Sequence, residues 1–149
     1  MRAVVQRVRE ASVTVNDHVC GEIGPGLLVY LGVAVDDGQN DAAYLADKVM
    51  NLRIFPDAKE KLNLSVADAR GAALVVSAFT VQADARRGRR PSFESAANPA
   101  HALAMYESFC DTLAKGGLIV ARGAFGEMMD VKSVNAGPVC ILLDSRRGF

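Results

Sequence analysis

The segment SVNAGPVCILLD, residues 133–144, joins a turn-like tetrapeptide to an apolar run. The valine, isoleucine and leucine residues of 139–143 favour a β-strand, whereas NAGP at 135–138 is typical of a turn. Most Gly-Pro pairs lie in plain turns, and only about 5% of X-Pro bonds are cis. The sequence therefore predicts a turn at 135–138 that leads into a strand over 138–144. Whether this turn only reverses the chain or forms part of a site depends on the chemistry that the rest of the sequence offers.

The remaining chain contains further groups of strand-like residues. Val13 and Val15 alternate with Ser12 and Thr14, which is the period of two of a half-buried strand. The nearly continuous apolar run after GPG at 24–26 predicts a strand that is covered on both faces. We expect strands in residues 3–17 (two, with a break between them), 18–35 (two, joined by the turn), 54–66 (a short hairpin), 72–84, 118–125, 127–135 and 138–144.

Two segments have the spacing of amphipathic helices. Asp41 is the expected cap of the first, whose apolar stripe is Ala42, Leu45, Val49 and Leu52. Asn98-Pro99 begins the second and Gly116-Gly117 ends it, with a stripe made of Leu103, Tyr106, Phe109, Cys110 and Leu113. Because the strands come in groups rather than alternating with helices, we predict one α+β domain over residues 1–149, with a largely antiparallel sheet and two main helices.

Composition and charge disfavour several classes of protein. Lys plus Arg and Asp plus Glu each total 17, so no net charge draws the chain to nucleic acid or to a membrane. Three widely spaced cysteines without a CxxC pair disfavour a disulfide framework or a structural zinc site. The N-terminus has no apolar signal segment, and no run approaches the ~18 apolar residues of a membrane span. We expect a cytoplasmic protein without a metal ion, a cofactor or a membrane contact.

Conventional catalytic groups are scarce. Only two histidines occur, His18 and His101, and neither has a carboxylate at a spacing that would orient it as a general base. GxSxG, HExxH, GxxxxGK[ST] and GxGxxG motifs are all absent from the sequence. Cys140 alternates within an apolar strand, which predicts a buried thiol rather than a nucleophile. Ser77 and Thr80 end another apolar strand, where such residues either cap the backbone or line a pocket.

Two short stretches together resemble a known family. SAFTV at 77–81 and NAGPV at 135–139 resemble the two signature motifs of the D-aminoacyl-tRNA deacylases. QRVREASVTV, GEIGPGLLVYLGV, RIFPDAKEKLNLSV and RRPSF look like the same family in the same order, so the resemblance covers the whole chain. It implies the fold of that family, with a barrel-like sheet core. The chain departs from the family pattern at Ala78, where glutamine is usual, and at Cys140, where threonine is usual.

The resemblance also implies an activity. Members of the family cleave the ester that joins a D-amino acid to the terminal ribose of tRNA, a chirality proofreading step in translation. They are homodimers in which the Gly-Pro of one subunit, with a cis peptide bond, reaches into the pocket of the other. Carried over, Gly137 and Pro138 are the chirality filter and Arg7 holds their loop across the dimer. The other expected pocket residues are Ser77, Ala78, Phe79, Thr80 and Met129.

This activity suits a chain without an obvious general base. An aminoacyl ester is already activated, and the neighbouring 2′-hydroxyl of the tRNA can assist the attack. The protein then mainly needs N–H donors for the oxyanion, each worth about 3–4 kcal/mol in other hydrolases, and the segment around Phe79 and Thr80 is the candidate. Thr80 as a covalent nucleophile ranks lower because no base is visible to activate it. A filter that rejects side chains has no means of excluding glycine, so we expect glycyl-tRNA to be cleaved too.

One dense basic loop follows the expected catalytic strand. Arg86, Arg87, Arg89 and Arg90 are either a solvated surface loop or a salt-dependent phosphate site for the acceptor end of tRNA. Phe93 is a candidate to stack on the terminal adenine, or else a core residue. Three interpretations compete with the deacylase: an RNA-end binding protein disarmed by Ala78, a dimeric scaffold, and an ester hydrolase of relaxed chirality.

Overall fold

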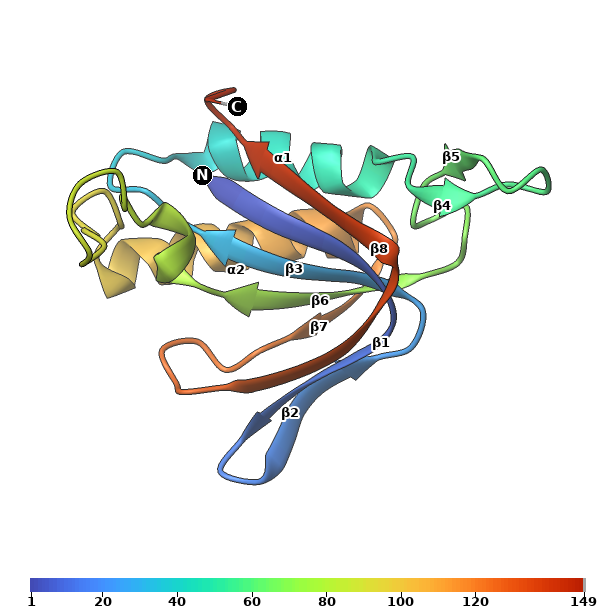
Figure 1. Cartoon of the computed structure of the whole chain (residues 1–149), viewed down its shortest axis with the longest axis horizontal. Helices are drawn as coiled ribbons and strands as arrows, with labels where there is room; N and C mark the ends of the chain where they lie inside the picture. The colour runs from blue at the N-terminus through green and yellow to red at the C-terminus, as the bar shows by residue number, and fades with distance from the viewer. Residues whose placement is uncertain (149) are drawn as a thin grey trace.

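The structure, a computed structural model, describes residues 1–148 of the 149. A mixed sheet and two long helices make up most of the chain (Figure 1), which is the α+β class predicted from the sequence. The main sheet contains β1 (Arg2–Val15), β2 (His18–Ile23), β3 (Gly26–Gly32), β6 (Ala72–Ser77), β7 (Ile119–Arg122) and β8 (Asp130–Asp144). The helices are α1 (Gln39–Asn51), the 3-10 turn η1 (Phe79–Gln82) and α2 (Pro99–Lys115), and β4 (Phe55–Pro56) and β5 (Leu62–Leu64) form a separate hairpin.

The long strand β1 organises the sheet. It pairs antiparallel with β8 over most of its length, with β3 through its first half and with β2 through its second half. Beyond β3 the strands β6 and β7 follow in parallel. The sheet curls so far that a methyl group on Gly21 of β2 would lie 2.5 Å from the carbonyl oxygen of Arg122 on β7. The strands therefore nearly close into the expected barrel-like core.

Two strands are longer than the sequence predicted. β1 runs unbroken from Arg2 to Val15 and β8 from Asp130 to Asp144, so the break predicted within 3–17 and the turn predicted at 135–138 are both wrong. The tetrapeptide forms a bulge instead, because Gln6 pairs with Cys140 and Val8 pairs with Asn135. Four residues of β8, 136–139, thus lie opposite a single residue of β1. The chain direction does not reverse there.

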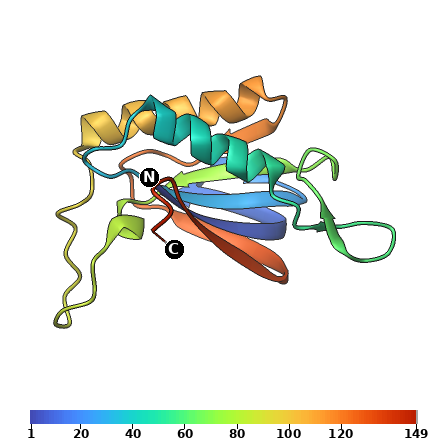
Figure 2. The same ribbon diagram turned by 90° about the horizontal axis from the view of Figure 1, so that it is seen from above.

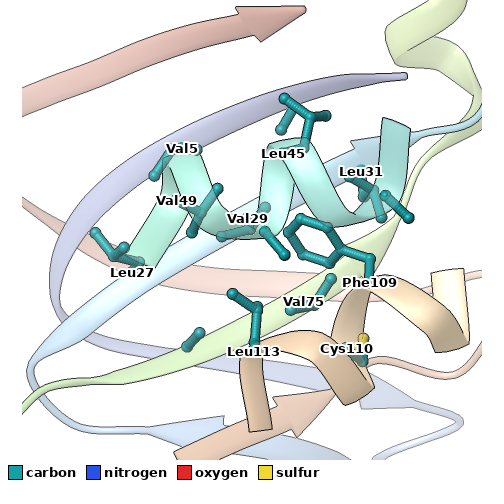
Figure 3. Close-up of a cluster of buried hydrophobic side chains, with 14 of the residues drawn as sticks. Val5, Leu27, Val29, Leu31, Leu45, Val49, Val75, Phe109, Cys110 and Leu113 are labelled. Atoms are coloured by element: carbon teal, nitrogen blue, oxygen red, sulfur yellow. The ribbon is translucent and has the colours of Figure 1, made fainter. Parts of the chain in front are cut away.

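Both helices cover one face of the sheet (Figure 2). Figure 3 shows the layer between helices and sheet, which consists of alternate residues of β1, β3 and β6 against the apolar stripes of α1 and α2. Its labelled members are Val5, Leu27, Val29, Leu31, Val75, Leu45, Val49, Phe109, Cys110 and Leu113. The other face of the sheet buries Val8, Val13, Leu28, Leu74 and Val76 inside the curl. β3 is therefore covered on both faces, as its continuous apolar run predicted.

The helix ends follow the sequence signals with two corrections. The Asn98 side chain accepts a hydrogen bond from the His101 N–H at 3.0 Å and caps α2, as predicted. The cap of α1 is Gly38 rather than Asp41, which lies inside the first turn and accepts from the Gly38 N–H at 2.9 Å. Leu103 is exposed, so its place in the buried stripe of α2 was wrong.

The loop after β3 holds both described ends of the chain. The Asp37 carboxylate is buried, and its Oδ1 accepts from the α-amino group of Met1 at 2.5 Å and from Arg146 at 3.2 Å. The Asp37 carbonyl oxygen lies 2.8 Å from Nε2 of His101, at the start of α2. These contacts fix the loop against the helix that forms one wall of the pocket described below. In the part of the chain that the structure describes, no helix is long and apolar enough to cross a membrane.

Candidate active site

A pocket of about 490 Å³ lies where β3 and β6 end. Its walls come from these strand ends, from η1, from the first turn of α2 and from the β7–β8 loop, which gather at one end of the molecule (Figure 1). Five residues that the sequence singled out line it together: Ser77, Ala78, Phe79, Thr80 and Met129. They come from two segments far apart in the chain, so the pocket is a product of the fold.

A short hydrogen-bonded turn carries the first motif. The Ala78 N–H donates to the Leu31 carbonyl at 2.9 Å, which continues the strand pairing by one step. The chain then coils into η1, where the Val81 N–H donates to the Ala78 carbonyl at 3.1 Å. The buried Gln82 side chain donates to the Gly32 carbonyl at 2.7 Å and fastens the turn to the end of β3. The expected strand over 72–84 therefore ends at Ser77.

The start of η1 carries two backbone donors beside the pocket. The first N–H groups of a helix have no acceptor within it, and within residues 1–148 the N–H groups of Phe79 and Thr80 donate to no protein atom. Both residues are exposed and line the pocket. Two adjacent N–H groups at the mouth of an apolar pocket can stabilise an oxygen that gains negative charge.

Titratable side chains are few in this pocket. Its lining includes Tyr30, whose pKa is raised by burial, so the phenol stays neutral at pH 7. Glu127 is the lining carboxylate and is exposed at the rim. Neither histidine contributes, because His18 lies in the exposed β1–β2 hairpin and His101 turns to the Asp37 carbonyl. The described residues thus give the pocket no histidine base.

Apolar groups surround the backbone donors. The Phe79 side chain is 58% exposed, and Met128 at the rim is 91% exposed. Phe93 does not line the pocket but packs edge to face on Phe79, with ring centroids 5.1 Å apart. An apolar rim of this kind is suited to a flat or apolar ligand group. Phe93 supports that rim from outside.

The bulge of β8 lies away from this pocket. Gly137 and Pro138 are exposed, their peptide bond is cis, and neither lines the pocket of its own chain. Nε of Arg7 donates to the Ala136 carbonyl at 2.8 Å, and Nη1 donates to the Ile54 carbonyl at 2.6 Å. Within the single chain, Arg7 therefore contacts the bulge that carries Gly137 and Pro138.

Two residues of β8 differ from what the sequence suggested. Cys140 is exposed, so the prediction of a buried thiol was wrong: residues 139–143 do alternate, but Cys140 lies with Leu142 on the outward face, whereas Val139, Ile141 and Leu143 pack against the core. Asn135 was quoted only as part of a motif, yet its side chain pairs with both backbone groups of Val139. An asparagine beside Gly-Pro at a strand end was the available signal for such a contact.

The basic loop begins and ends at one antiparallel β-bridge. Asp84 and Ser92 exchange backbone hydrogen bonds of 2.8 and 2.9 Å, and residues 85–91 extend beyond them (Figure 2). The Asp84 carboxylate accepts from Nε and Nη2 of Arg86 at 2.9 and 2.6 Å, which holds the pKa of Asp84 well below its usual range. Arg87, Arg89 and Arg90 are exposed and form no ion pair with any residue of 1–148.

Among residues 1–148, no group of three or more His, Cys, Asp or Glu side chains lies close enough together to hold a metal ion. The three thiols are free and do not form a cluster.

Comparison with known proteins gives consistent matches over the whole chain. The family model described as D-Tyr-tRNA(Tyr) deacylase matches residues 4–144. A D-aminoacyl-tRNA deacylase of Syntrophobacter fumaroxidans is 56% identical over 149 residues, which is 100% of each chain. A solved structure described as c-Myc DNA Unwinding Element Binding Protein is 39% identical, with a TM-score of 0.91 over 97% of this chain and 98% of that one. A probable eukaryotic D-amino acid tRNA deacylase shares the fold, with a TM-score of 0.80 at 18% identity over 95% and 97% of the two chains.

Proposed function

The chain belongs to the D-Tyr-tRNA(Tyr) deacylase family, and on that premise we propose that it hydrolyses D-aminoacyl-tRNA to free tRNA and the D-amino acid. The observation that carries the proposal is the pocket at the end of β3 and β6. It combines an apolar lining with two adjacent backbone N–H groups, those of Phe79 and Thr80. This is the equipment needed to stabilise the oxyanion of an activated ester without a catalytic triad.

In the proposed reaction a water molecule attacks the carbonyl carbon of the ester. The carbonyl oxygen becomes the oxyanion and accepts hydrogen bonds from the N–H groups of Phe79 and Thr80. The bond between carbonyl carbon and ribose oxygen then breaks, the ribose oxygen takes a proton, and the amino acid leaves as a carboxylate. The neighbouring 2′-hydroxyl of the tRNA passes one proton of the water to the ribose oxygen, because no described residue of the pocket lining is a histidine, and the second proton goes to solvent. Each donor contributes about 3–4 kcal/mol to the transition state, by comparison with other hydrolases.

The proposal gives Gly137 and Pro138 the role of a chirality filter that acts in the pocket of a second subunit. Support comes from their position, since both are exposed and lie outside the pocket of their own chain. β8 is also an outer strand with the exposed apolar side chains Val134 and Leu142, as expected of an edge that another chain can cover. In this arrangement main-chain carbonyls bind the substrate ammonium and leave no room for an L side chain.

Glycyl-tRNA is a further proposed substrate. A filter made of main-chain atoms discriminates by excluding a side chain, and glycine has none to exclude. Its ammonium and ester are otherwise the same as those of a D-aminoacyl group. We therefore propose that the pocket cleaves glycyl-tRNA, and complete resistance of that substrate would contradict the rejection mechanism.

The arginine loop is the proposed contact with the acceptor end of tRNA in the cytoplasm. Arg87, Arg89 and Arg90 offer three cations beside η1 that form no ion pair within residues 1–148, whereas Arg86 is held by Asp84. Phosphate binding by such a loop loses affinity steeply with salt. Phe93 supports the exposed ring of Phe79, which gives the terminal adenine an aromatic surface beside the pocket.

Two variants of one residue test the proposed chemistry. Thr80→Pro removes the N–H donor at a position in the first helical turn where proline is tolerated, and it should lower the deacylation rate of D-tyrosyl-tRNA by roughly 10²–10³-fold. Thr80→Ala keeps the N–H and removes only the hydroxyl, so it should retain activity within a few-fold. The reverse order would identify Thr80 as a covalent nucleophile and refute the backbone mechanism. Circular dichroism verifies that both variants fold.

Ala78 gives one competing function a specific basis. The methyl side chain of Ala78 lines the pocket at the position where the family pattern usually has the amide of glutamine. The pocket therefore keeps a surface for the RNA end but has one polar group fewer. A non-catalytic RNA-end binding protein would bind an aminoacyl-tRNA mimic tightly without turnover. Equal cleavage of D and L esters would instead indicate a hydrolase of relaxed chirality, and a dimer indifferent to tRNA would indicate a scaffold.

A further inference from the structure

The bulge of β8 is closed by a side chain rather than by the neighbouring strand. Val139 falls outside the register of β1, which passes from Gln6–Cys140 directly to Val8–Asn135. A strand residue without a partner strand must satisfy its backbone groups in another way. Asn135 does this, because its Oδ1 accepts from the Val139 N–H at 2.9 Å and its Nδ2 lies 3.3 Å from the Val139 carbonyl oxygen as donor.

The two hydrogen bonds give the bulge a fixed size. A side-chain amide that pairs with both the N–H and the C=O of one residue acts as a substitute for a backbone partner. It joins residue 135 to residue 139 and leaves only Ala136, Gly137 and Pro138 in the closed loop. The asparagine contact lies within β8 itself, so it does not depend on which chain supplies the pocket.

The loop is thus held at both ends by different groups. Arg7 holds the carbonyl of Ala136 at its first residue, and Asn135 holds Val139 just after its last. Little space remains between them, since a methyl group on Gly137 would lie 2.9 Å from the Val139 nitrogen and 3.1 Å from Nη2 of Arg7. Loss of either holding group would let the exposed Gly137-Pro138 peptide move.

We propose that Asn135 is a positioning residue that determines the preference for D over L substrates. The inference rests on the proposed function, because it takes Gly137 and Pro138 as the filter. Asn135 touches neither the substrate nor the backbone donors; it fixes where the carbonyls of the filter lie. A filter that excludes one enantiomer by close contact depends on the positions of these carbonyl groups more strongly than the overall fold does. In a reaction that depends on positioning, a displacement of about 1 Å lowers the rate on the order of 10²-fold.

Three variants separate positioning from general damage. Asn135→Ala removes both hydrogen bonds, whereas Asn135→Asp keeps the acceptor for the Val139 N–H, which is the shorter of the two. Asn51→Ala is the matched control, since it deletes an exposed asparagine whose side chain bonds, among residues 1–148, only to Asp47 at the end of α1. Single-turnover deacylation of D- and L-tyrosyl-tRNA gives the D/L rate ratio for each protein. Exchange of the Val139 amide hydrogen, followed by NMR, reports the bulge without reference to activity.

The expected result is a graded loss of discrimination. Asn135→Ala should lower the D/L ratio by about tenfold or more, as the loss of two hydrogen bonds predicts, and should accelerate exchange at Val139. Asn135→Asp should lie between it and the wild type, and Asn51→Ala should match the wild type. An unchanged ratio in Asn135→Ala beside a discriminating wild type, or unchanged Val139 exchange, overturns the inference. A wild-type chain that cleaves neither ester refutes the proposed function instead, and Val139 exchange then still decides whether Asn135 fixes the loop.

Discussion

Replacing Gly137 by alanine places a methyl group in the most crowded part of the β8 bulge. Gly137 has a φ of +143°, a backbone conformation that side chains with a Cβ rarely adopt. The new Cβ would lie 2.9 Å from both the nitrogen and Cγ2 of Val139 and 3.1 Å from Nη2 of Arg7. The Val139 nitrogen is a backbone atom held by Asn135 and has no room to give way. The loop itself must therefore move.

The magnitude follows from the two effects taken separately. A strained backbone conformation at one non-glycine residue costs about 1–3 kcal/mol, so the free energy of unfolding should fall by that amount. Displacement of the Gly137-Pro138 peptide by about 1 Å should lower the D-tyrosyl-tRNA rate on the order of 10²-fold. The activity loss should exceed what the small loss of stability can explain, because most of the protein stays folded.

Urea denaturation and single-turnover deacylation measure these two quantities on the same preparation. Gly24→Ala is the matched control, since no atom lies within 4 Å of its added methyl group and its φ is not positive. The control should leave stability within about 0.5 kcal/mol and both rates unchanged. A Gly137→Ala protein with wild-type stability and a wild-type D-tyrosyl-tRNA rate would refute the structural argument. Lost stability with an unchanged D-tyrosyl-tRNA rate would refute only the role of Gly137 in the filter.

Three further perturbations test other contacts. Asp84→Asn releases Arg86 from its ion pair, so the slope of log affinity for tRNA against log salt should steepen by up to about one unit. Asp37→Asn leaves Arg146 and the buried α-amino group without their shared carboxylate, and should lower the free energy of unfolding by about 3–5 kcal/mol. Hydrogen bonds from the Ser145 hydroxyl and from the Gly38 N–H lower the pKa of Asp41. The resulting stabilisation of the folded state is present above the pKa that Asp41 has in the unfolded chain, and it is lost as the pH falls through the lower pKa of the folded state. Asp41→Asn should therefore flatten the acid limb of a stability–pH profile.

Each of these expectations has a contrary outcome. An unchanged salt slope in a filter-binding assay at 50–200 mM salt would mean that Arg86, once released, does not contact phosphate. If urea denaturation of Asp37→Asn shows that the free energy of unfolding falls by less than ~1 kcal/mol, the buried carboxylate does not contribute the stability expected of it. Parallel acid limbs for Asp41→Asn and the wild type would assign acid unfolding to other carboxylates.

Local sequence patterns predicted which helices and strands form better than they predicted where each strand begins and ends. Asn98-Pro99 and the apolar stripe of α2 were sufficient to place that helix, because capping and amphipathicity act over a few residues. The turn expected at 135–138 was wrong because strand pairing with β1 continues on both sides of it. A local turn signal does not reveal that a partner strand spans it, and only tertiary pairing turns the tetrapeptide into a bulge.

The candidate site shows the same limit. From the sequence, Ser77 and Thr80 either cap the end of a strand or line a pocket. Both line the pocket, whose wall also requires the distant β7–β8 loop. Cys140 was expected inside because every residue of 139–143 is apolar, so the sequence does not show which set of alternate residues faces the core; Val139, Ile141 and Leu143 do, and the thiol is exposed. The type of Asn135 suggested a contact with nearby backbone but not its partner, because Val139 loses its partner on β1 only through the bulge.

The most direct test is single-turnover deacylation of D-tyrosyl-tRNA and L-tyrosyl-tRNA by the chain as it stands and by Ala78→Gln. A pocket that works through backbone donors and a main-chain filter should cleave the D ester and spare the L ester with alanine at position 78. Glutamine at that position should change the D rate by less than the removal of a backbone donor does. Hydrolysis that begins only with Ala78→Gln, or equal cleavage of both esters by the unaltered chain, would contradict the account.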